Sequence, residues 1–414
     1  MPPITRKNLA ATVGAIVDRT PIYDIHTHIY DAPFGGLLLW GVDELLTYHY
    51  LVAEVFRHAP MPYERFWAMS RTAQADHIWE HLFVRHSPVS ESCRGVLTCL
   101  HALGIDTGRR DLPRIRKYFS RTTAAKYVET VFTTANVSGV VMTNNPFDDA
   151  ERPVWERTLR RDGRFQAALR MDPLLMEWPS AARTLKQWGY EVRADLGGRT
   201  MTSLRRFLND WRVRMKPLYM AVSLPPDFAF PDSSARTKII EGAILPFSRE
   251  HNIPFAMMIG VKKLVNPHLR LAGDSVGKSD IRTVEHLCAA YPRNKFLVTF
   301  LARENQHEAC ITARKFPNLM LFGCWWFLNN PSLIEEMTRM RLETLGFSMI
   351  PQHSDARVLD QLLYKWTHSR AVIAKVLTDK YADLLATGWK IDQAEIARDV
   401  ADLFGGTFHR FLAR

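Results

Sequence analysis

The sequence predicts an α/β protein of the (β/α)8, or TIM, barrel class, built from one chain of 414 residues. Eight short apolar segments alternate with amphipathic segments, as is typical of parallel strands joined by helices. Hydrophobic residues make up 47% of the chain, enough to bury a large core. Two histidines end the first apolar segment and an aspartate follows the last one. Because the strands of such a barrel end at one rim, these polar residues predict an active site there.

The expected strands are short apolar runs bounded by polar residues, glycine or proline. Such runs fit strands that are buried on both faces, although a buried helix segment can look similar. The number of runs and their even distribution along the chain therefore count for more than any single run. The expected strands are 21–29, 137–144, 165–171, 219–224, 254–260, 295–300, 319–327 and 347–350.

Amphipathic segments lie between the later strands and after the last one, and we expect them to form helices. They are 238–251, 281–291, 307–316, 331–345, 358–385 and 393–412. The gap between the first two strands, residues 30–136, is long and carries its own helical patterns at 42–56, 63–84 and 124–133. We expect this gap to be a helical insertion that caps the first strand, within a single barrel domain of residues 1–414.

Charge and cysteine content narrow the function classes. The net charge of +11 permits nucleic-acid binding, but the basic residues are scattered, and the same charge attracts a small anionic substrate. The five cysteines form no C-x-x-C pair, which favours reduced thiols in a cytoplasmic protein. No apolar run approaches the ~18 residues of a membrane span, and the first residues lack a signal-peptide pattern. A homo-oligomer is compatible with this composition.

The first strand ends in His26 and His28, which are two residues apart. Side chains at this spacing point to the same face of a strand, where two imidazoles can bind one metal ion. Alone, the pair would be interpreted as histidines on a loop or a solvated strand face, and Asp355 alone as a loop residue or a helix N-cap. Closure of the barrel, however, brings the first and eighth strands together. The three side chains then form a site for one divalent ion, for which zinc is our first expectation and iron, manganese, cobalt and nickel also fit.

The histidine pair and the final aspartate together resemble the amidohydrolase superfamily. More narrowly, the chain resembles the uronate (glucuronate) isomerase family over almost its whole length. The motifs that carry this resemblance are His49-Tyr50, Gly323-Cys-Trp-Trp-Phe327 and Ser354-Asp355-Ala356-Arg357. The fourth strand lacks a lysine that could bridge two metals, and the fifth and sixth end without a ligand histidine. The chain therefore departs from the two-metal hydrolase pattern and suits at most one ion.

The resemblance implies an aldose–ketose isomerase, which is an intramolecular oxidoreductase. Such an enzyme interconverts D-glucuronate and D-fructuronate, and D-galacturonate and D-tagaturonate, by moving a proton from C2 to C1 through an enediol. This reaction needs a base, a proton shuttle between the two oxygens, stabilisation of the oxyanion and a clamp for the carboxylate.

The resemblance implies that Asp355 is the base as well as a metal ligand. It also implies that Tyr50 moves the proton between the oxygens, with His49 beside it. Without the resemblance, His49 and Tyr50 would be read as a packed aromatic pair. An arginine two residues away, Arg357, favours the ionised form of Asp355 if the two side chains pair.

The resemblance further implies that Arg170 and Arg357 bind the substrate carboxylate and hydroxyls, because a guanidinium can contact a carboxylate with two parallel hydrogen bonds. His49 and Tyr50 join them as substrate-binding residues, and Trp326 walls the pocket against the sugar. Each has a structural alternative: a surface ion pair for Arg170, a pair with the nearby aspartate for Arg357, and core packing for Trp326.

Other functions remain open at this level. The same barrel supports a mononuclear metal-dependent hydrolase or decarboxylase of the amidohydrolase superfamily, which would need a water held near Asp355. Assays of uronate isomerisation and of acid release from an ester, lactone or amide separate the two. A nucleic-acid-binding protein or an inactive scaffold would leave the two histidines and the aspartate without a purpose, so the expected partner is a small uronate rather than nucleic acid or a membrane.

Overall fold

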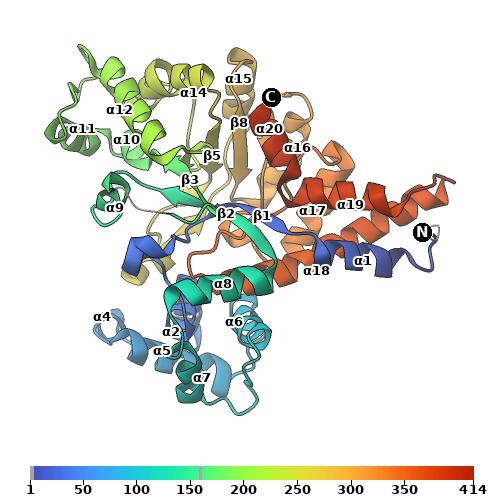
Figure 1. Ribbon diagram of the computed structural model, residues 1–414. Coiled ribbons are helices and arrows are strands. Elements are labelled where there is room, and N and C mark those ends of the chain that lie inside the picture. Colours follow the sequence, from blue (N-terminus) through green and yellow to red (C-terminus); the bar gives the residue numbers. More distant parts are fainter. Residues whose placement is uncertain (1–3, 158–160) are drawn as a thin grey trace.

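The computed structural model describes residues 4–157 and 161–414, and its centre is a curled sheet of seven parallel strands (Figure 1). The strand order follows the chain, β1-β2-β3-β4-β5-β8-β9, so every neighbouring pair is parallel and all strands end at the same edge. The strands are β1 (Ile22–Thr27), β2 (Val137–Asn144), β3 (Phe165–Arg170), β4 (Met220–Leu224), β5 (Phe255–Ile259), β8 (Phe296–Phe300) and β9 (Leu319–Leu321). The expected α/β class is confirmed, and the first six predicted strands lie within three residues of their expected ends.

The last two predicted strands are only partly formed. The expected strand 319–327 ends at Leu321, because Gly323 takes a left-handed conformation (φ +66°) that turns the chain out of the sheet. The expected strand 347–350 is wrong as a strand, because only one parallel bridge, between Phe322 and Ile350, forms there. The residue that follows is Pro351, which has no N–H group to donate to a ladder.

The chain after Ile350 still runs between β9 and β1. On one side, the Ile350 N–H donates to the Leu321 carbonyl at 3.2 Å. On the other side, the Asp355 N–H donates to the His26 carbonyl at 3.2 Å, and the His28 N–H donates to the Ala356 carbonyl at 2.7 Å. This segment, residues 351–357, therefore brings Asp355 to the end of β1.

Residues 30–136 are largely helical, and in Figure 1 most of their helices gather below the strands. The predicted helix 42–56 is broken at Tyr48, whose backbone is extended (φ −64°, ψ 142°), so His49 begins a new helix. The predicted helix 63–84 is likewise divided. The elements of this region are η1 (Ala32–Leu37), α2 (Val42–Leu46), α3 (His49–His58), α4 (Tyr63–Trp67), α5 (Arg71–Trp79), η2 (Glu80–Val84), α6 (Glu91–Ala102), α7 (Leu112–Phe119) and α8 (Ala124–Ala135).

Helices between the strands cover the outside of the sheet, and a short hairpin, β6 (Val261–Lys262) with β7 (Ser275–Val276), follows β5. The hairpin was not predicted. The helices are α9 (Arg152–Glu156), α10 (Asp172–Met176), α11 (Trp178–Gln187), α12 (Thr200–Met215), α13 (Ala235–Ile239), η3 (Ile240–Ile244), α14 (Leu245–His251), η4 (Pro267–Gly273), α15 (Arg282–Ala290), η5 (Arg303–Asn305), α16 (Gln306–Ala313), η6 (Trp326–Leu328) and α17 (Pro331–Leu345).

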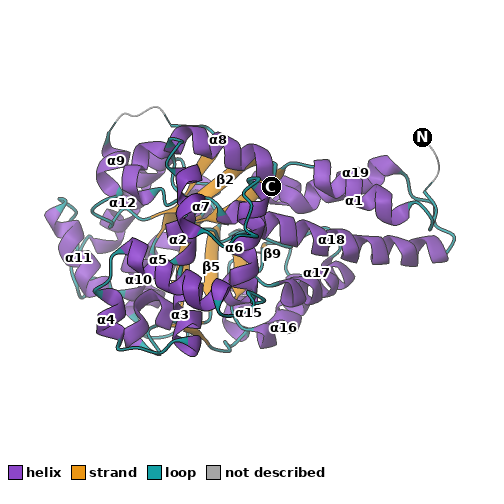
Figure 2. Ribbon diagram, turned by 90° about the horizontal axis from the view of Figure 1, so that it is seen from below, coloured by secondary structure: helices purple, strands orange, loops and turns teal. Residues whose placement is uncertain are grey.

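Helices from the two ends of the chain lie together and project from the sheet in both views (Figures 1 and 2). They are α1 (Leu9–Arg19), α18 (Gln361–Ala386) and α19 (Gln393–Ala401), and the chain ends in η7 (Asp402–Gly406) and α20 (Thr407–Ala413). The predicted helix 393–412 is interrupted at Gly405, where φ is +131°. No helix in the described part of the chain has the length and apolar character needed to cross a bilayer.

The core has two layers, one inside the curl of the sheet and one between the sheet and its helices. Alternate strand residues such as Ile25, Val141 and Leu297 pack inside the curl, and their neighbours, such as Met142 and Val298, pack against the helices. Both sets are buried, which explains why the strands read as continuous apolar runs.

Candidate active site

His26, His28 and Asp355 meet at the carboxyl end of β1, as the sequence predicted. The Asp355 Oδ1 atom lies 3.4 Å from His28 Nε2 and 3.7 Å from His26 Nε2, and one potential ligand atom from each residue lies within 4.8 Å of the others. Asp355 has a positive φ of 52°, a conformation that is uncommon for non-glycine residues. The backbone bonds to β1 hold the aspartate in this place.

The ionisation of these three groups suits a divalent cation. Burial lowers the pKa of His26 and of His28, so both imidazoles are neutral. Burial alone would raise the pKa of Asp355, whereas a hydrogen bond and positive charge from His28, and charge from His26, lower it below its usual range when these rings carry a proton on Nε2. His26 Nε2 and Asp355 Oδ1 are buried and have no hydrogen-bond partner in the part of the chain that the structure describes. Two neutral imidazoles and one carboxylate with lone pairs left free fit one metal ion.

The other nitrogen of each histidine contacts a hydroxyl group that the sequence analysis did not include. The Tyr219 hydroxyl lies 3.0 Å from His26 Nδ1, and Thr143 Oγ1 lies 2.7 Å from His28 Nδ1. Thr143 is on β2 and Tyr219 directly precedes β4. A hydroxyl within a buried apolar strand was the only available signal, and the sequence alone does not say which atom it faces.

A cavity of about 90 Å³ opens beside this cluster. It contains six of the eight predicted site residues, two of them metal ligands, and it adds others that were not predicted. Its lining is His28, Tyr48, His49, Arg170, Ser223, Met258, Lys263, Leu271, Asp274, Trp325, Trp326, Asp355 and Arg357. Tyr50 is not part of this wall, and its hydroxyl is buried without a partner, whereas Tyr48 lies on the wall.

His49 and Trp326 contact one another across the cavity wall. The Trp326 indole N–H donates to His49 Nε2 at 3.1 Å, and burial lowers the pKa of His49 to about 3, so the ring is a neutral acceptor. The rings of Tyr48 and Tyr50 also pack on His49, with centroids 4.1 and 4.5 Å away. His49 is therefore both a packed aromatic residue and a cavity residue, so the two alternatives raised by the sequence are compatible.

The two arginines of the cavity differ in how much of their charge is already paired. The Arg170 guanidinium donates to both oxygens of Asp172, at 2.8 and 2.6 Å, and to Ser223 at 3.2 Å. No carboxylate of the described residues pairs with the Arg357 side chain. The alternative in which Arg357 pairs with Asp355 is thus not realised, and Arg357 offers the cavity an uncompensated positive charge.

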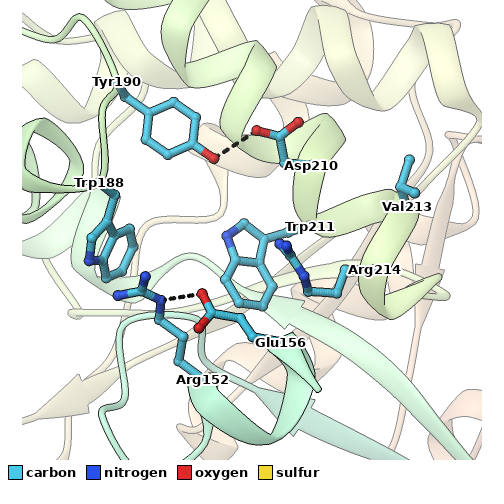
Figure 3. Close-up of a pocket in the computed structure, with 8 residues that line it drawn as sticks. All are labelled: Arg152, Glu156, Trp188, Tyr190, Asp210, Trp211, Val213 and Arg214. Atoms are coloured by element: carbon cyan, nitrogen blue, oxygen red, sulfur yellow. Dashed lines mark hydrogen bonds and ion pairs between the residues drawn. The ribbon is translucent and has the colours of Figure 1, made fainter. Parts of the chain in front are cut away.

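A larger cavity lies elsewhere and does not contain these groups. It measures about 530 Å³ and is bordered by α9, the segment after α11 and the end of α12 (Figure 3). Two of its polar pairs are closed, with Arg152 donating to Glu156 at 2.8 Å and Tyr190 donating to Asp210 at 2.7 Å, and the Arg214 guanidinium lies over the Trp211 ring. The smaller cavity beside Asp355 is therefore the candidate active site.

A curled parallel sheet with a buried two-histidine, one-aspartate cluster at its carboxyl edge defines the class of protein, an α/β enzyme with a site suited to a metal ion. The whole chain is similar to a uronate isomerase of Bacillus halodurans, with 57% sequence identity, a TM-score of 0.98, and coverage of 99% of this chain and 97% of that one. The chain belongs to the uronate isomerase family, whose members are aldose–ketose isomerases.

Two more distant solved structures share the fold. A uronate isomerase from Thermotoga maritima is 15% identical, with a TM-score of 0.77 and coverage of 98% of this chain and 97% of that one. A glucuronate isomerase from Caulobacter crescentus is 14% identical, with a TM-score of 0.78 and coverage of 99% and 94%. No family model and no curated protein sequence matches the chain.

Proposed function

We propose that the chain interconverts D-glucuronate and D-fructuronate, and D-galacturonate and D-tagaturonate, by moving a proton from C2 to C1 through an enediol. One observation supports the proposal most directly. The ionised carboxylate of Asp355 and the guanidinium of Arg357, which pairs with no carboxylate of the described residues, line the same small cavity. A base and an anion clamp in one cavity are what an anionic hydroxy-aldehyde needs.

We further propose that the chain forms a complete (β/α)8 barrel of the amidohydrolase type. Residues 1–414 form one domain, and residues 30–136 form its cap. The hydrogen bonds that residues 350–356 make to β9 on one side and to β1 on the other support closure of the sheet. The wall residues His49 and Tyr48, which come from the 30–136 region, support a capping role for that region. The five buried free thiols support a cytoplasmic setting.

His26, His28 and Asp355 would hold one divalent ion, which we take to be zinc. When bound, the ion supplies positive charge that favours negative charge on the substrate oxygens. The residues supply the remaining chemistry. The bound ion and the nearby Arg357 would both favour the ionised form of Asp355, and the ionised carboxylate can accept a proton.

The proton transfer itself uses Asp355. Its carboxylate takes the proton from C2, the electron pair of the C2–H bond forms the C1–C2 double bond, and the C1 oxygen gains a proton. The C2 hydroxyl then gives up its proton as the carbonyl forms there, and Asp355 returns a proton to C1. We assign the transfer between the oxygens to Tyr50, whose buried hydroxyl has no hydrogen-bond partner among the described residues, with Tyr48 on the cavity wall as the second candidate.

Substrate binding divides between the two arginines. Arg357, whose charge is unpaired, takes the substrate carboxylate, preferably through two hydrogen bonds. Arg170 is already paired with Asp172, which holds it in place at the wall to contact the carboxylate or a hydroxyl. Trp326 covers one side of the sugar, and its hydrogen bond to His49 fixes its indole ring.

The test is an assay of the purified protein with D-glucuronate and D-galacturonate, each with and without a chelator, in parallel with elemental analysis. We expect isomerisation, one divalent ion per chain and loss of activity with the chelator. Acid release from a lactone, ester or amide without isomerisation would instead identify a mononuclear hydrolase. Two ions per chain would contradict the metal assignment.

A further inference from the structure

His26 and His28 each contact a buried hydroxyl group in the same way. The hydroxyl of Tyr219 lies 3.0 Å from His26 Nδ1 and 2.8 Å from the carbonyl oxygen of Ile25. The hydroxyl of Thr143 lies 2.7 Å from His28 Nδ1 and 3.0 Å from the carbonyl oxygen of Thr27. In both cases, one hydroxyl bridges a histidine and the carbonyl of the residue just before it.

The position of the protons follows from this arrangement. A hydroxyl group has one proton to donate, and a carbonyl oxygen can only accept. The hydroxyls of Tyr219 and Thr143 therefore donate to the two carbonyls and accept from the histidines. Each imidazole must then carry its proton on Nδ1 and leave Nε2 as a bare lone pair. Both hydroxyl residues are buried, so water does not compete for these bonds.

This choice of tautomer decides what the cluster can bind. With the proton on Nε2, His28 could donate to Asp355 Oδ1, which lies 3.4 Å away, and the cluster would satisfy itself without an ion. With the proton on Nδ1, the two Nε2 atoms and the carboxylate oxygen are three acceptors that face one another. Among the described residues, His26 Nε2 and Asp355 Oδ1 have no hydrogen-bond partner, and 3.4 Å between His28 Nε2 and Asp355 Oδ1 is long for a hydrogen bond, which agrees with the second state.

The other neighbours of His26 do not determine which of its ring nitrogens carries the proton. Its ring lies near those of Phe322 and His353, at centroid distances of 6.3 and 4.9 Å. Phe322 has no polar atom, and both ring nitrogens of His353 lack a hydrogen-bond partner. Within the described residues, the hydroxyl of Tyr219 is thus the group that sets the proton on His26.

We propose that Tyr219 and Thr143 are positioning residues that hold His26 and His28 in the Nδ1–H tautomer and so keep the cluster open to a divalent ion. The inference concerns the proposed metal site and does not depend on which uronate reacts. Hydrogen bonds of this kind to ligand histidines fix ring orientation and raise metal affinity in general.

The variants are Tyr219→Phe and Thr143→Val, which each remove one hydroxyl and little else. The chain offers a matched control for both. Tyr381→Phe removes a buried hydroxyl that donates to Asp399 at 3.0 Å, between α18 and α19. Thr299→Val removes a buried hydroxyl on β8 that has no hydrogen-bond partner.

The first measurement is NMR of the metal-free protein labelled with ¹⁵N-histidine, with His26 and His28 assigned by replacing each in turn. A protonated and a bare ring nitrogen resonate far apart, so the spectrum reports the tautomer directly. We expect Nδ1–H for both histidines in the wild type and in the controls. In Tyr219→Phe, only His26 should shift toward Nε2–H, and in Thr143→Val, only His28 should do so.

The second measurement is the affinity for Zn²⁺, by competition with a chromophoric chelator. Each variant should bind Zn²⁺ about 10–100-fold more weakly than its control, the usual effect of removing such a partner. Thr143→Ser keeps the hydroxyl and should restore the affinity. Both measurements are made without substrate. They therefore test the metal site even if the protein does not isomerise a uronate.

An Nδ1–H tautomer that persists in the variants would overturn the proposal, even if the affinity fell. Zn²⁺ affinities equal to those of the controls would overturn it as well. If Tyr219→Phe does not fold, the nearly isosteric change Thr143→Val decides the question at His28.

Discussion

At the scale of single residues, the chemistry depends on a carboxylate that stays ionised although it is buried. Asp355 is 5% exposed, and the positive charges of a bound ion and of the nearby Arg357 would keep it ionised against the effect of burial. We expect Asp355→Asn to keep the shape of the side chain and to remove the base. The isomerisation rate should fall by about 10²–10⁴-fold.

The readout that separates a base from a metal ligand is isotope exchange. Wild type and Asp355→Asn are incubated with substrate in deuterated water, and the label at C1 and C2 is followed by NMR. Exchange at near wild-type rate in the variant would mean that another group moves the C2 proton. Tyr50→Phe and Tyr48→Phe are then the next variants to compare, because both rings lie against His49.

Also at this scale, the unequal pairing of the two arginines predicts unequal effects. Arg357→Met should weaken the reaction of a uronate far more than that of the matching neutral aldose. Losing a charge-assisted hydrogen bond costs about 1.5–3 kcal/mol, or roughly 10–100-fold in kcat/KM. Arg170→Met also leaves Asp172 without its partner, so both sugars should react more slowly.

The comparison is made as the ratio of kcat/KM for the two sugars in each variant. A ratio unchanged by Arg357→Met would show that this arginine does not bind the carboxylate. If the ratio falls only in Arg170→Met, then Arg170 rather than Arg357 binds the substrate carboxylate.

At the scale of secondary-structure elements, the end of β9 controls how the aromatic wall is placed. Gly323 has φ +66°, and a Cβ atom at this position would lie 2.3 Å from His353 Nδ1. We therefore expect Gly323→Ala to destabilise the fold, by roughly 1–2 kcal/mol from the left-handed backbone and about 1–3 kcal/mol from overpacking.

Gly104→Ala is the matched control, because Gly104 has φ +71° and no atom within 4 Å of the added Cβ. The control carries only the backbone effect, and the difference between the two variants measures the clash with His353. Chemical denaturation gives both values. Equal destabilisation of the two variants would show that His353 moves aside without cost.

At the scale of the whole molecule, one buried carboxylate joins the 30–136 region to the long helix α18. Asp360, at the start of α18, accepts hydrogen bonds from the Tyr127 hydroxyl and from the Gly41 N–H, at 2.9 Å for the latter. Its own backbone carbonyl accepts from the Cys99 thiol. Three separate segments of the predicted cap therefore converge on this one residue.

This convergence predicts a pH dependence of stability. Burial raises the pKa of Asp360 to about 6, although the bonds from Tyr127 and Gly41 oppose the rise. The folded pKa lies above the unfolded value of about 3.9, so protonation of Asp360 favours folding. The contribution is fully present below the unfolded pKa and is lost as the pH rises through about 6.

Asp360→Asn removes this titration, so the variant should gain stability relative to the wild type as the pH rises from about 4 to about 7. Urea unfolding across this range measures the difference. Asp210→Asn is the control, because Asp210 also accepts from a tyrosine hydroxyl but lies in a partly exposed groove (Figure 3). Parallel pH profiles of Asp360→Asn and the wild type would contradict the prediction.

Features set by local chemistry were readable from the sequence. The first six strands are continuous apolar runs because both of their faces are buried, and such a run is visible in the sequence. His26 and His28 share a face because the strand repeat is two residues. Their meeting with Asp355 followed from the single assumption that the first and last strands are neighbours.

Features that depend on contacts between segments far apart in the chain were decided only by the tertiary structure. The break at Tyr48 and the short β9 depend on backbone conformations that no apolar pattern records. Likewise, Asp172 neutralises Arg170, and Tyr219 and Thr143 face His26 and His28, from positions that look like ordinary core or loop residues. A hydrogen bond is formed by the atom that lies within about 3 Å with the right orientation, and this is a property of packing in three dimensions rather than of spacing along the chain.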